Sequence, residues 1–292
     1  MYVVNSLEEF DSVGSNKIIG TGNLKNTKIV FKGENNILFL GKDVRISDSV
    51  ISFECDNSVV YISESRHEYK LGVSVNNRCT LFIGKNNYIN NKISISVSEQ
   101  TNVVIGEDGM FSFGIWIRTA DPHLIYDIET GDRINPSKGV FIGDHVWVGQ
   151  NVMITKGSQI GSGSIIGAMG LVSGQKIPSN QIWGGVPVKK IKSGIFFTKE
   201  CVHAYNDEKT AAVQHKDTKD YIYNENGAVK FSDIDNALSR FKTAAEKFEY
   251  IQKNLAKVKD KNRFFINEKN QNKVGFFKKM LKNLNELYKC KT

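Results

Sequence analysis

A branched aliphatic residue recurs at every sixth position through residues 140–173, VFIGDHVWVGQNVMITKGSQIGSGSIIGAMGLVS. The aliphatic positions are Ile142, Val148, Ile154, Ile160, Ile166 and Val172. A small or β-branched side chain stands two positions before each of them, and Gly follows four of them. An α-helix repeats every ~3.6 residues and a strand about every two, so neither explains this period. The repeat instead indicates a solenoid of stacked coils.

Two inward-facing positions in every six residues describe one flat side of a coil. Three sides complete a triangular coil of eighteen residues, and stacked coils bury their apolar residues against one another. This stacking predicts three vertical pairs, which are Ile142–Ile160, Val148–Ile166 and Ile154–Val172. The glycines suit corners where a side chain would clash.

A looser form of the pattern extends towards the N-terminus. Leu40, Ile62, Ile83 and Ile105 lie 22, 21 and 22 residues apart, each after a short β-rich run. We therefore predict one all-β solenoid domain over residues 18–195, preceded by an N-terminal segment at 1–17. The pattern stops once, at RTADPHLIYDIETGDRINPSK, residues 118–138. A long polar loop on a rigid scaffold is commonly a functional element.

The periodicity changes after the solenoid, and residues 196–292 have the pattern of a helical, basic region. Apolar residues at three-to-four spacing predict a helix over 234–259, capped by Asp233, and another over 276–288. The chain has a net charge of +8, and residues 253–292 hold 12 Lys and Arg against 3 Asp and Glu, a net of +9. Such a tail suits an acidic partner or a membrane surface, or else it packs as an ordinary helical face. A nucleic acid is not a partner that we expect.

Cysteine spacing and hydropathy limit the class of protein. The four cysteines show no C-x-x-C spacing, which argues against a zinc site or a disulfide framework and fits a reducing cytosol. The start, MYVVNSLEEF, lacks the basic and apolar regions of a secretory signal. No apolar stretch is long enough to span a bilayer. We expect a cytoplasmic protein, at most peripheral on the inner face of the membrane.

The six-residue repeat followed by GGVPVKKIK resembles the hexapeptide-repeat acyltransferases. The resemblance implies a left-handed parallel β-helix, an exception to the right-handed crossover rule, here with an α-helical C-terminal extension. It also implies a homotrimer that binds acetyl-CoA in the groove between neighbouring prisms. More narrowly, DPHLIYDIETGDRIN and GVFIGDHVWVGQNV are similar to the enzymes that O-acetylate sugars and capsular polysaccharides, such as the polysialic-acid O-acetyltransferases.

Acetyl transfer from a thioester to a sugar hydroxyl needs a base, hydrogen-bond donors for the oxyanion, and alignment of the two substrates. A neutral histidine serves as base at pH 7. His123 lies in the loop beside Asp121, and the resemblance makes it the catalytic histidine. Asp121 or Asp127 is predicted to orient the imidazole. His145, on a coil wall, is the competing base or a substrate contact, expected to line the groove or to face solvent.

Two tryptophans and an arginine complete the expected acceptor pocket. Trp147 points outward from a coil, and the resemblance makes it a catalytic pocket wall that also contacts the cosubstrate, although burial in a trimer interface explains it too. Trp116, just before the loop, can stack on a sugar ring. Arg133 is predicted to close the loop through a salt bridge to Asp127, or to contact an acidic acceptor.

Coenzyme A presents an extended amide arm, which needs small residues beside it, and phosphates, which need cations. The candidates for this cosubstrate are Gly149, Gly167, Ala168, Lys176, Lys189 and Lys190. The resemblance places Ala168 at the pantetheine arm and the three lysines near the nucleotide end. The alternative role for the lysines is solvation of the end of the prism. No metal is expected.

These features predict an acetyl-CoA-dependent O-acetyltransferase that modifies a hydroxyl of a capsular or other surface polysaccharide. The second hypothesis is N- or O-acetylation of a small amino sugar or sugar nucleotide. The third is a non-catalytic solenoid that scaffolds a partner, such as a capsule-synthesis complex, through its basic tail.

Overall fold

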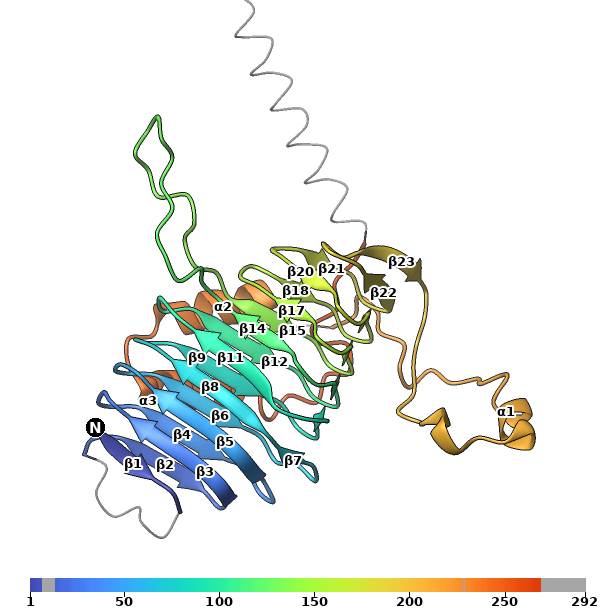
Figure 1. Ribbon diagram of the computed structural model, residues 1–292, viewed down its shortest axis with the longest axis horizontal. Coiled ribbons are helices and arrows are strands. Elements are labelled where there is room, and N and C mark those ends of the chain that lie inside the picture. Colours follow the sequence, from blue (N-terminus) through green and yellow to red (C-terminus); the bar gives the residue numbers. More distant parts are fainter. Residues whose placement is uncertain (7–13, 228, 269–292) are drawn as a thin grey trace, which may run out of the picture.

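The chain winds as a solenoid whose coils build three sheets, shown in Figure 1. The computed structural model describes residues 1–6, 14–227 and 229–268. Successive coils add strands to the sheets, and neighbouring strands are parallel except for one antiparallel pair at the edge of each of two sheets. The helix expected at 276–288 lies outside the described residues.

The strands follow in sheet order. Sheet A contains β1 (Tyr2–Val4), β3 (Asn23–Phe31), β5 (Arg45–Phe53), β8 (Leu71–Val75), β11 (Ile93–Val97), β14 (Trp116–Arg118), β17 (Met153–Ile154) and β20 (Leu171–Val172), with β7 (Glu68–Tyr69) beside β5. Sheet B contains β2 (Lys17–Gly20), β4 (Ile37–Leu40), β6 (Val59–Ile62), β9 (Thr80–Ile83), β12 (Asn102–Ile105), β15 (Val140–Ile142), β18 (Gln159–Ile160) and β21 (Lys176–Ile177). Sheet C contains β10 (Tyr88–Ile89), β13 (Met110–Phe111), β16 (Trp147–Val148), β19 (Ile165–Ile166), β22 (Gln181–Gly184) and β23 (Lys189–Ser193).

The aliphatic positions of the repeat form vertical stacks inside the prism. The three predicted pairs, Ile142–Ile160, Val148–Ile166 and Ile154–Val172, are confirmed by the strand registers. Each of these six side chains is fully buried. The upstream series is also in register, from Leu40 through Ile62 and Ile83 to Ile105. Since each coil covers the apolar side chains of the next, the stack itself supplies the core.

The long loop at 118–138 leaves the solenoid without disturbing the register. It connects β14 of sheet A with β15 of sheet B, and Ile142 still lies over Ile105. In Figure 1 it projects from the prism as a narrow green finger. We call residues 118–138 the hairpin excursion.

The N-terminal segment takes part in the solenoid. Strand β1 pairs antiparallel with β3, with Val4 opposite Ile29. Val4 is buried in the main core. This strand was not predicted, because three residues are too few to show a period.

The C-terminal region differs from the single helix predicted over 234–259. The structure has α2 (Phe231–Arg240) and α3 (Ala244–Asn254), and Lys230 rather than Asp233 is the N-cap of α2. Phe241 is extended, and Thr243 starts α3 through a capping box with Glu246. A Thr-x-x-Glu box satisfies the free backbone amides at the start of a helix, so it favours a second helix after the extended residue.

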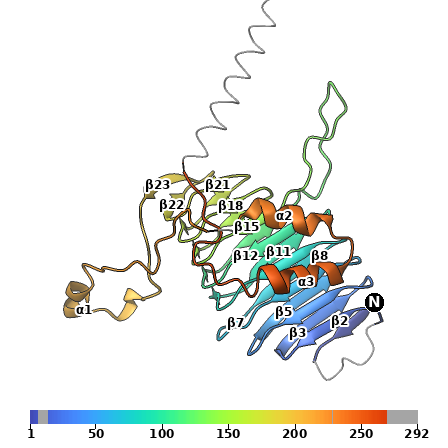
Figure 2. The same cartoon turned by 180° about the vertical axis from the view of Figure 1, so that it is seen from behind.

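These two helices cover the outer face of sheet B, as Figure 2 shows from behind. Large side chains on this face pack against the helices in a second apolar cluster. The strands provide Ile37, Val59, Tyr61, Phe82, Val104 and Phe141, and the C-terminal region provides Phe231, Ile234, Leu238, Ile251, Leu255 and Phe264. The outer faces of sheets A and C carry no such cover among the described residues, which leaves them as the open walls of the prism.

A second projection lies between β23 and α2. It contains a 3₁₀ turn (Val202–Ala204) and the short helix α1 (Asp207–Ala212), which extend away from the prism in Figure 1. No helix within the described ranges is long and apolar enough to cross a membrane.

Candidate active site

The hairpin excursion is an antiparallel finger with an ordered turn. Tyr126 and Arg133 form an isolated bridge, and the Ile134 amide donates to the Ile125 carbonyl at 2.9 Å. The carboxylate of Asp127 accepts from the amides of Glu129 and Thr130, both at 2.9 Å. These amide hydrogen bonds lower the pKa of Asp127. Asp127 therefore stabilises the turn and is not directed at an imidazole.

The base of the excursion is fixed by Asn135, whose side chain is 5% exposed. Its Nδ2 donates to the His123 carbonyl at 2.8 Å and to Oδ2 of Asp121 at 3.2 Å. Its Oδ1 accepts from the Ile125 amide at 2.9 Å. Lys156, on the following coil, donates to the same Asp121 oxygen at 2.6 Å and to the Asn135 carbonyl at 3.1 Å. One amide side chain thus joins both strands of the finger at the level of His123.

The imidazole of His123 is presented to solvent. His123 is exposed, and within the described part of the chain its ring makes no hydrogen bond, while its backbone is held by Asn135. The Asp121 carboxylate is occupied by Lys156 and Asn135, and the hydrogen bond from Lys156 is the main cause of its lowered pKa. Asp121 therefore fixes the backbone around His123 and does not bond the ring directly.

Arg133 does not form the predicted salt bridge with Asp127. Its guanidinium pairs with Glu99, in the turn after β11, at 2.7 and 2.9 Å. Ser137 donates to the same carboxylate at 2.5 Å. The hydrogen bonds from Arg133 and Ser137 lower the pKa of Glu99 to about 2. The excursion is thereby fastened to the adjacent coil and not only to itself.

Trp147 stands in a vertical row of large side chains on the outer face of sheet C. The register from coil to coil places Tyr88, Met110, Trp147, Ile165 and Ile182 in this row. Trp147 is 41% exposed. The prediction that its indole points outward is therefore confirmed.

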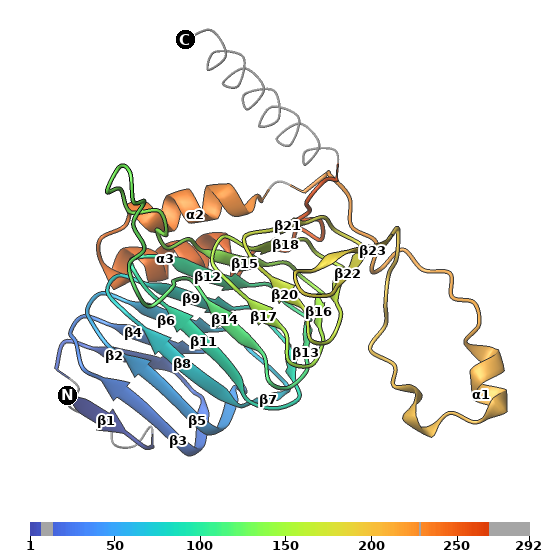
Figure 3. The same ribbon diagram turned by 45° about the horizontal axis from the view of Figure 1, so that its top comes forward.

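Within one chain, His123 and Trp147 are on different sides of the prism. The excursion leaves at the corner between sheets A and B, whereas β16 lies in sheet C. Figure 3 shows the excursion at the corner opposite β16. A site that uses both side chains is incomplete in a single copy.

His145 neither lines a groove nor faces solvent, which corrects the expectation for this residue. It is 1% exposed, and its ring nitrogens lie 2.9 Å from Oδ2 of Asp108 and 3.0 Å from the carbonyl oxygen of Phe197. The ring is also stacked between Phe197 and Tyr221. A ring enclosed in this way reaches no substrate, so His145 is neither a base nor a substrate contact.

Trp116 lies on the outer face of sheet A and is 46% exposed. The guanidinium of Arg118 lies over its ring, 5.5 Å from the centroid. In the coils below, Ser94 and Gly72 occupy the position of Trp116. The indole therefore stands beside a shallow hollow that is lined mostly by Ser and Gly.

The small residues assigned to coenzyme A differ in their exposure. Ala168 is exposed and Gly167 half-buried, next to Gly184 of the following coil. Gly149 is buried below Ala168, where a Cβ would lie 2.6 Å from the Ala168 nitrogen, so it serves close packing of coils instead of an open wall.

The three lysines do not share one surface. Lys189 and Lys190 are exposed on β23 of sheet C, and Lys190 pairs with Glu268 at 2.5 Å. Lys176 is on β21 of sheet B. The structure thus brings Lys189 and Lys190 together and separates Lys176 from them.

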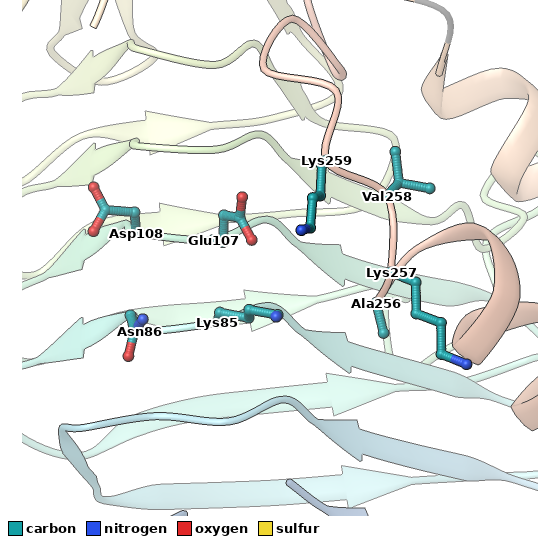
Figure 4. Close-up of a pocket in the computed structure, with 8 residues that line it drawn as sticks. All are labelled: Lys85, Asn86, Glu107, Asp108, Ala256, Lys257, Val258 and Lys259. Atoms are coloured by element: carbon teal, nitrogen blue, oxygen red, sulfur yellow. The ribbon is translucent and has the colours of Figure 1, made fainter. Parts of the chain in front are cut away.

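A hollow between the solenoid and the segment after α3 is lined by charges of both signs. Lys85, Glu107, Lys257 and Lys259 surround it in Figure 4. It contains none of the predicted site residues. No cluster of metal-ligating side chains occurs in the ranges that the structure describes.

Comparison with known proteins finds a family match for the repeat. Residues 139–174 match the bacterial transferase hexapeptide family, in a segment of six repeats. The crystal structure of the polySia specific acetyltransferase NeuO superimposes with a TM-score of 0.56 at 27% identity, covering 68% of this chain and 97% of NeuO. The resemblance to the hexapeptide-repeat acyltransferases is confirmed. The predicted left-handed parallel β-helix is confirmed with it.

Two curated proteins named polysialic acid O-acetyltransferase are also similar to this hexapeptide-repeat chain. The one from Neisseria meningitidis is 35% identical over 130 residues, or 44% of this chain and 60% of the relative. The one from Escherichia coli O1:K1 / APEC is 38% identical over 120 residues, or 41% of this chain and 39% of the relative. The chain spans less than two thirds of the length of either curated relative.

Several residues that shape the candidate site were missed by sequence reasoning. Asn135 and Lys156 fix the excursion, Glu99 holds it to a coil, and Phe197 lies against Trp147. The Asn-Pro pair in the excursion signals a fixed turn. The others carry no local signal, because their partners are far away in sequence.

Proposed function

We propose that this protein is an acetyl-CoA-dependent O-acetyltransferase that modifies a sugar hydroxyl of a capsular or other surface polysaccharide. The observation that carries the proposal is the solvent-facing imidazole of His123 on a finger whose backbone is fixed by Asn135. The similarity to polysialic acid O-acetyltransferases supports the reaction class.

His123 acts as general base in this proposal. Its imidazole takes the proton of the acceptor hydroxyl, the hydroxyl oxygen attacks the thioester carbonyl, and the proton passes to the departing thiolate of coenzyme A. The base must be within ~3 Å of the hydroxyl. Asn135, Asp121 and Lys156 keep the backbone of His123 in one place, which lowers the entropic cost of that approach.

The site is formed between two copies of the chain. Because the helices cover sheet B, sheets A and C are the faces open to neighbouring copies. We propose a homotrimer in which the excursion of one copy brings His123 to Trp147 of the next. Trp147 then forms a wall beside the acetyl group and the acceptor, and Trp116 offers a surface for a sugar ring.

Coenzyme A lies along the end of the prism in this arrangement. The exposed backbone at Gly167 and Ala168 is open to the amides of the pantetheine arm. Lys189 and Lys190 provide the cations for the phosphates, with Lys176 a more distant contribution from sheet B. Since acetyl-CoA is the acetyl donor, we place the reaction in the cytoplasm, where a basic C-terminal region can hold the protein near the membrane or a capsule-synthesis complex.

A complementation experiment tests both the residues and the shared site. His123→Ala and Trp147→Ala variants should each lose acetyl transfer to a polysaccharide panel, measured as release of coenzyme A. When co-expressed, the two variants form mixed assemblies in which some sites have both wild-type residues, so part of the activity should return. No recovery despite mixed assemblies would refute the shared site, and near-wild-type turnover of His123→Ala would refute the base.

Two controls separate the alternative functions. Thermal stabilisation by coenzyme A should persist in His123→Ala, because ligand binding to the native state raises stability independently of turnover. Absence of this effect in the wild-type protein would favour a non-catalytic scaffold. Transfer to amino sugars or sugar nucleotides in preference to polysaccharides would favour a small-molecule acetyltransferase.

A further inference from the structure

The projection between β23 and α2, residues 195–224, is rooted firmly although its tip is exposed. Asn180, at a corner of the last coil, holds both ends of it. Its Nδ2 donates to the carbonyls of Ile195 and Tyr221, both at 2.9 Å, and its Oδ1 accepts from the Tyr223 amide at 2.9 Å. The Tyr223 ring fills the space over Gly163, where a Cβ would lie 2.8 Å from the ring. We call residues 195–199 and 221–224 the root.

His145 is clamped between the two halves of the root. Phe197 stacks on one face of the imidazole at 4.1 Å and 12°, and Tyr221 on the other at 4.4 Å and 16°. All three rings are therefore nearly parallel. Since His145 belongs to the solenoid, this stack joins the root to the wall of the prism next to Trp147.

Both ring nitrogens of His145 have a polar partner. One nitrogen faces a carboxylate oxygen of Asp108 at 2.9 Å, and the other faces the Phe197 carbonyl oxygen at 3.0 Å. The ring is therefore held at both nitrogens, once by the solenoid and once by the root.

Asp108 is itself held by a lysine of the root. Lys199 donates to its other carboxylate oxygen at 2.6 Å. Burial raises the pKa of Asp108, but the hydrogen bonds from His145 and Lys199 outweigh it, so the net pKa is lowered. Asp108 is therefore ionised, and it fastens the root to the solenoid through Lys199.

The root contacts the indole of Trp147 through a single ring. Phe197 lies 5.9 Å from the Trp147 ring at 49°, a tilted aromatic pair. Phe197 is 8% exposed, so it is fixed by its surroundings, whereas Trp147 is 41% exposed. Tyr221 stacks on the face of His145 away from this pair and has no ring contact with Trp147 among the described residues. A rigid neighbour on one side restricts the orientations that a half-exposed indole adopts.

From these contacts we infer that the root of the 195–224 projection is part of the site at Trp147, with Phe197 as a positioning residue for the indole. His145 and Asp108 hold Phe197 in place. The inference about the indole stands on the ring contact alone, and only its effect on acetyl transfer rests on the proposed function.

The test compares Phe197→Leu with Tyr221→Leu. Each variant removes one ring from the His145 stack, but only the first removes the contact with Trp147. In a background of Trp116→Phe and Trp183→Phe, Trp147 is the sole tryptophan, and acrylamide quenching of its fluorescence reports its exposure. Phe197→Leu should raise the quenching constant about twofold or more, whereas Tyr221→Leu should leave it near the parent value.

Kinetics give the second readout. With the natural tryptophans present, Phe197→Leu should raise the KM for acetyl-CoA or the acceptor about two- to tenfold, the range expected from one aromatic pair, with a smaller change in kcat. Phe197→Tyr keeps the ring and should restore both readouts, even if Phe197→Leu folds poorly.

Equal quenching and equal KM in the Leu variants would overturn the inference. Altered quenching in a protein that transfers no acetyl group to any acceptor would overturn the proposed function and leave the positioning of Trp147 intact.

Discussion

Arg133 holds the hairpin excursion to the solenoid through a two-point ion pair with Glu99, with N–O distances of 2.7 and 2.9 Å. The two residues belong to different coils, and Ser137 adds a third bond to the same carboxylate. A bidentate arginine–carboxylate pair fixes orientation as well as distance. The position of His123 relative to the prism therefore depends on a contact ten residues away from it along the finger.

Removal of this pair should loosen the excursion without unfolding the solenoid. Arg133→Gln is expected to speed hydrogen exchange at residues 124–134 and to lower kcat about threefold, since partly exposed ion pairs contribute modestly. Glu99→Gln should behave in the same way, and the double variant should be no worse than either single one. The matched control is Asp127→Asn, which keeps an acceptor for the turn amides. Unchanged exchange in Arg133→Gln would show that the excursion is held by other contacts.

The Lys156–Asp121 contact should matter more to the rate, because it lies at the level of His123. Lys156→Met removes the ammonium that donates to Asp121 at 2.6 Å and to the Asn135 carbonyl. We expect kcat to fall about tenfold, equivalent to ~1.4 kcal/mol in the barrier, with little change in the KM for acetyl-CoA. Lys138→Met, an exposed lysine of the excursion's last turn, is the control. If both variants lose activity equally, the loss comes from the changed net charge of the protein and not from the position of His123.

The sequence predicts the solenoid well because each coil side has its own aliphatic residue at a fixed spacing of six. Ile142, Val148 and Ile154 each align with the residue eighteen positions later, as counting alone predicts. The hairpin excursion is equally predictable, because the six-residue repeat stops there. The outward direction of Trp147 follows from its place between two inward positions.

The surroundings of the site are not predictable in this way. His145 occupies a repeat position that looks exposed, and it is buried only because Phe197 and Tyr221, 52 and 76 positions later, return to it. The break between α2 and α3 depends on the capping box at Thr243 and on the shape of sheet B. Contacts between distant segments depend on the path of the chain, which no six-residue pattern records.

The pair formed by Arg263 and Asp144 should be a major contribution to stability. Arg263 is 2% exposed and Asp144 5% exposed, with nitrogen–oxygen distances of 2.7 and 3.0 Å. Removal of one member leaves an uncompensated buried charge, so Arg263→Met should lower the free energy of unfolding by about 3–5 kcal/mol. Chemical denaturation measures this loss. Lys257→Met, an exposed change in the same segment, should stay within about 0.5 kcal/mol.

The double variant Arg263→Met with Asp144→Asn tests whether the loss comes from the stranded charge. It should be more stable than the sum of the single changes predicts, because neither charge then remains buried alone. Strict additivity would mean that the two side chains stabilise the protein through separate contacts, such as the bonds from Arg263 to the carbonyls of Leu255 and Val258.

The buried Lys247 of α3 should make stability depend on pH. Burial lowers the pKa of Lys247 to about 8, and its ammonium donates to the Arg78 carbonyl of the solenoid. The unfolded chain keeps this group protonated up to about pH 10.4, so between pH 8 and 10 the unfolded state binds more protons. Stability attributable to Lys247 therefore rises with pH in this window, by about 1 kcal/mol per unit.

The measurement is the difference in unfolding free energy between the wild-type protein and Lys247→Met at pH 7, 8 and 9. The difference should move in favour of the wild type as pH rises. Cys79, whose pKa burial raises to about 11, has the opposite trend in both proteins. Lys253→Met, on the same helix but exposed, should show no such slope. A difference that is constant with pH would mean that Lys247 stays protonated in the folded protein, and that the helices are held to sheet B by a buried cation.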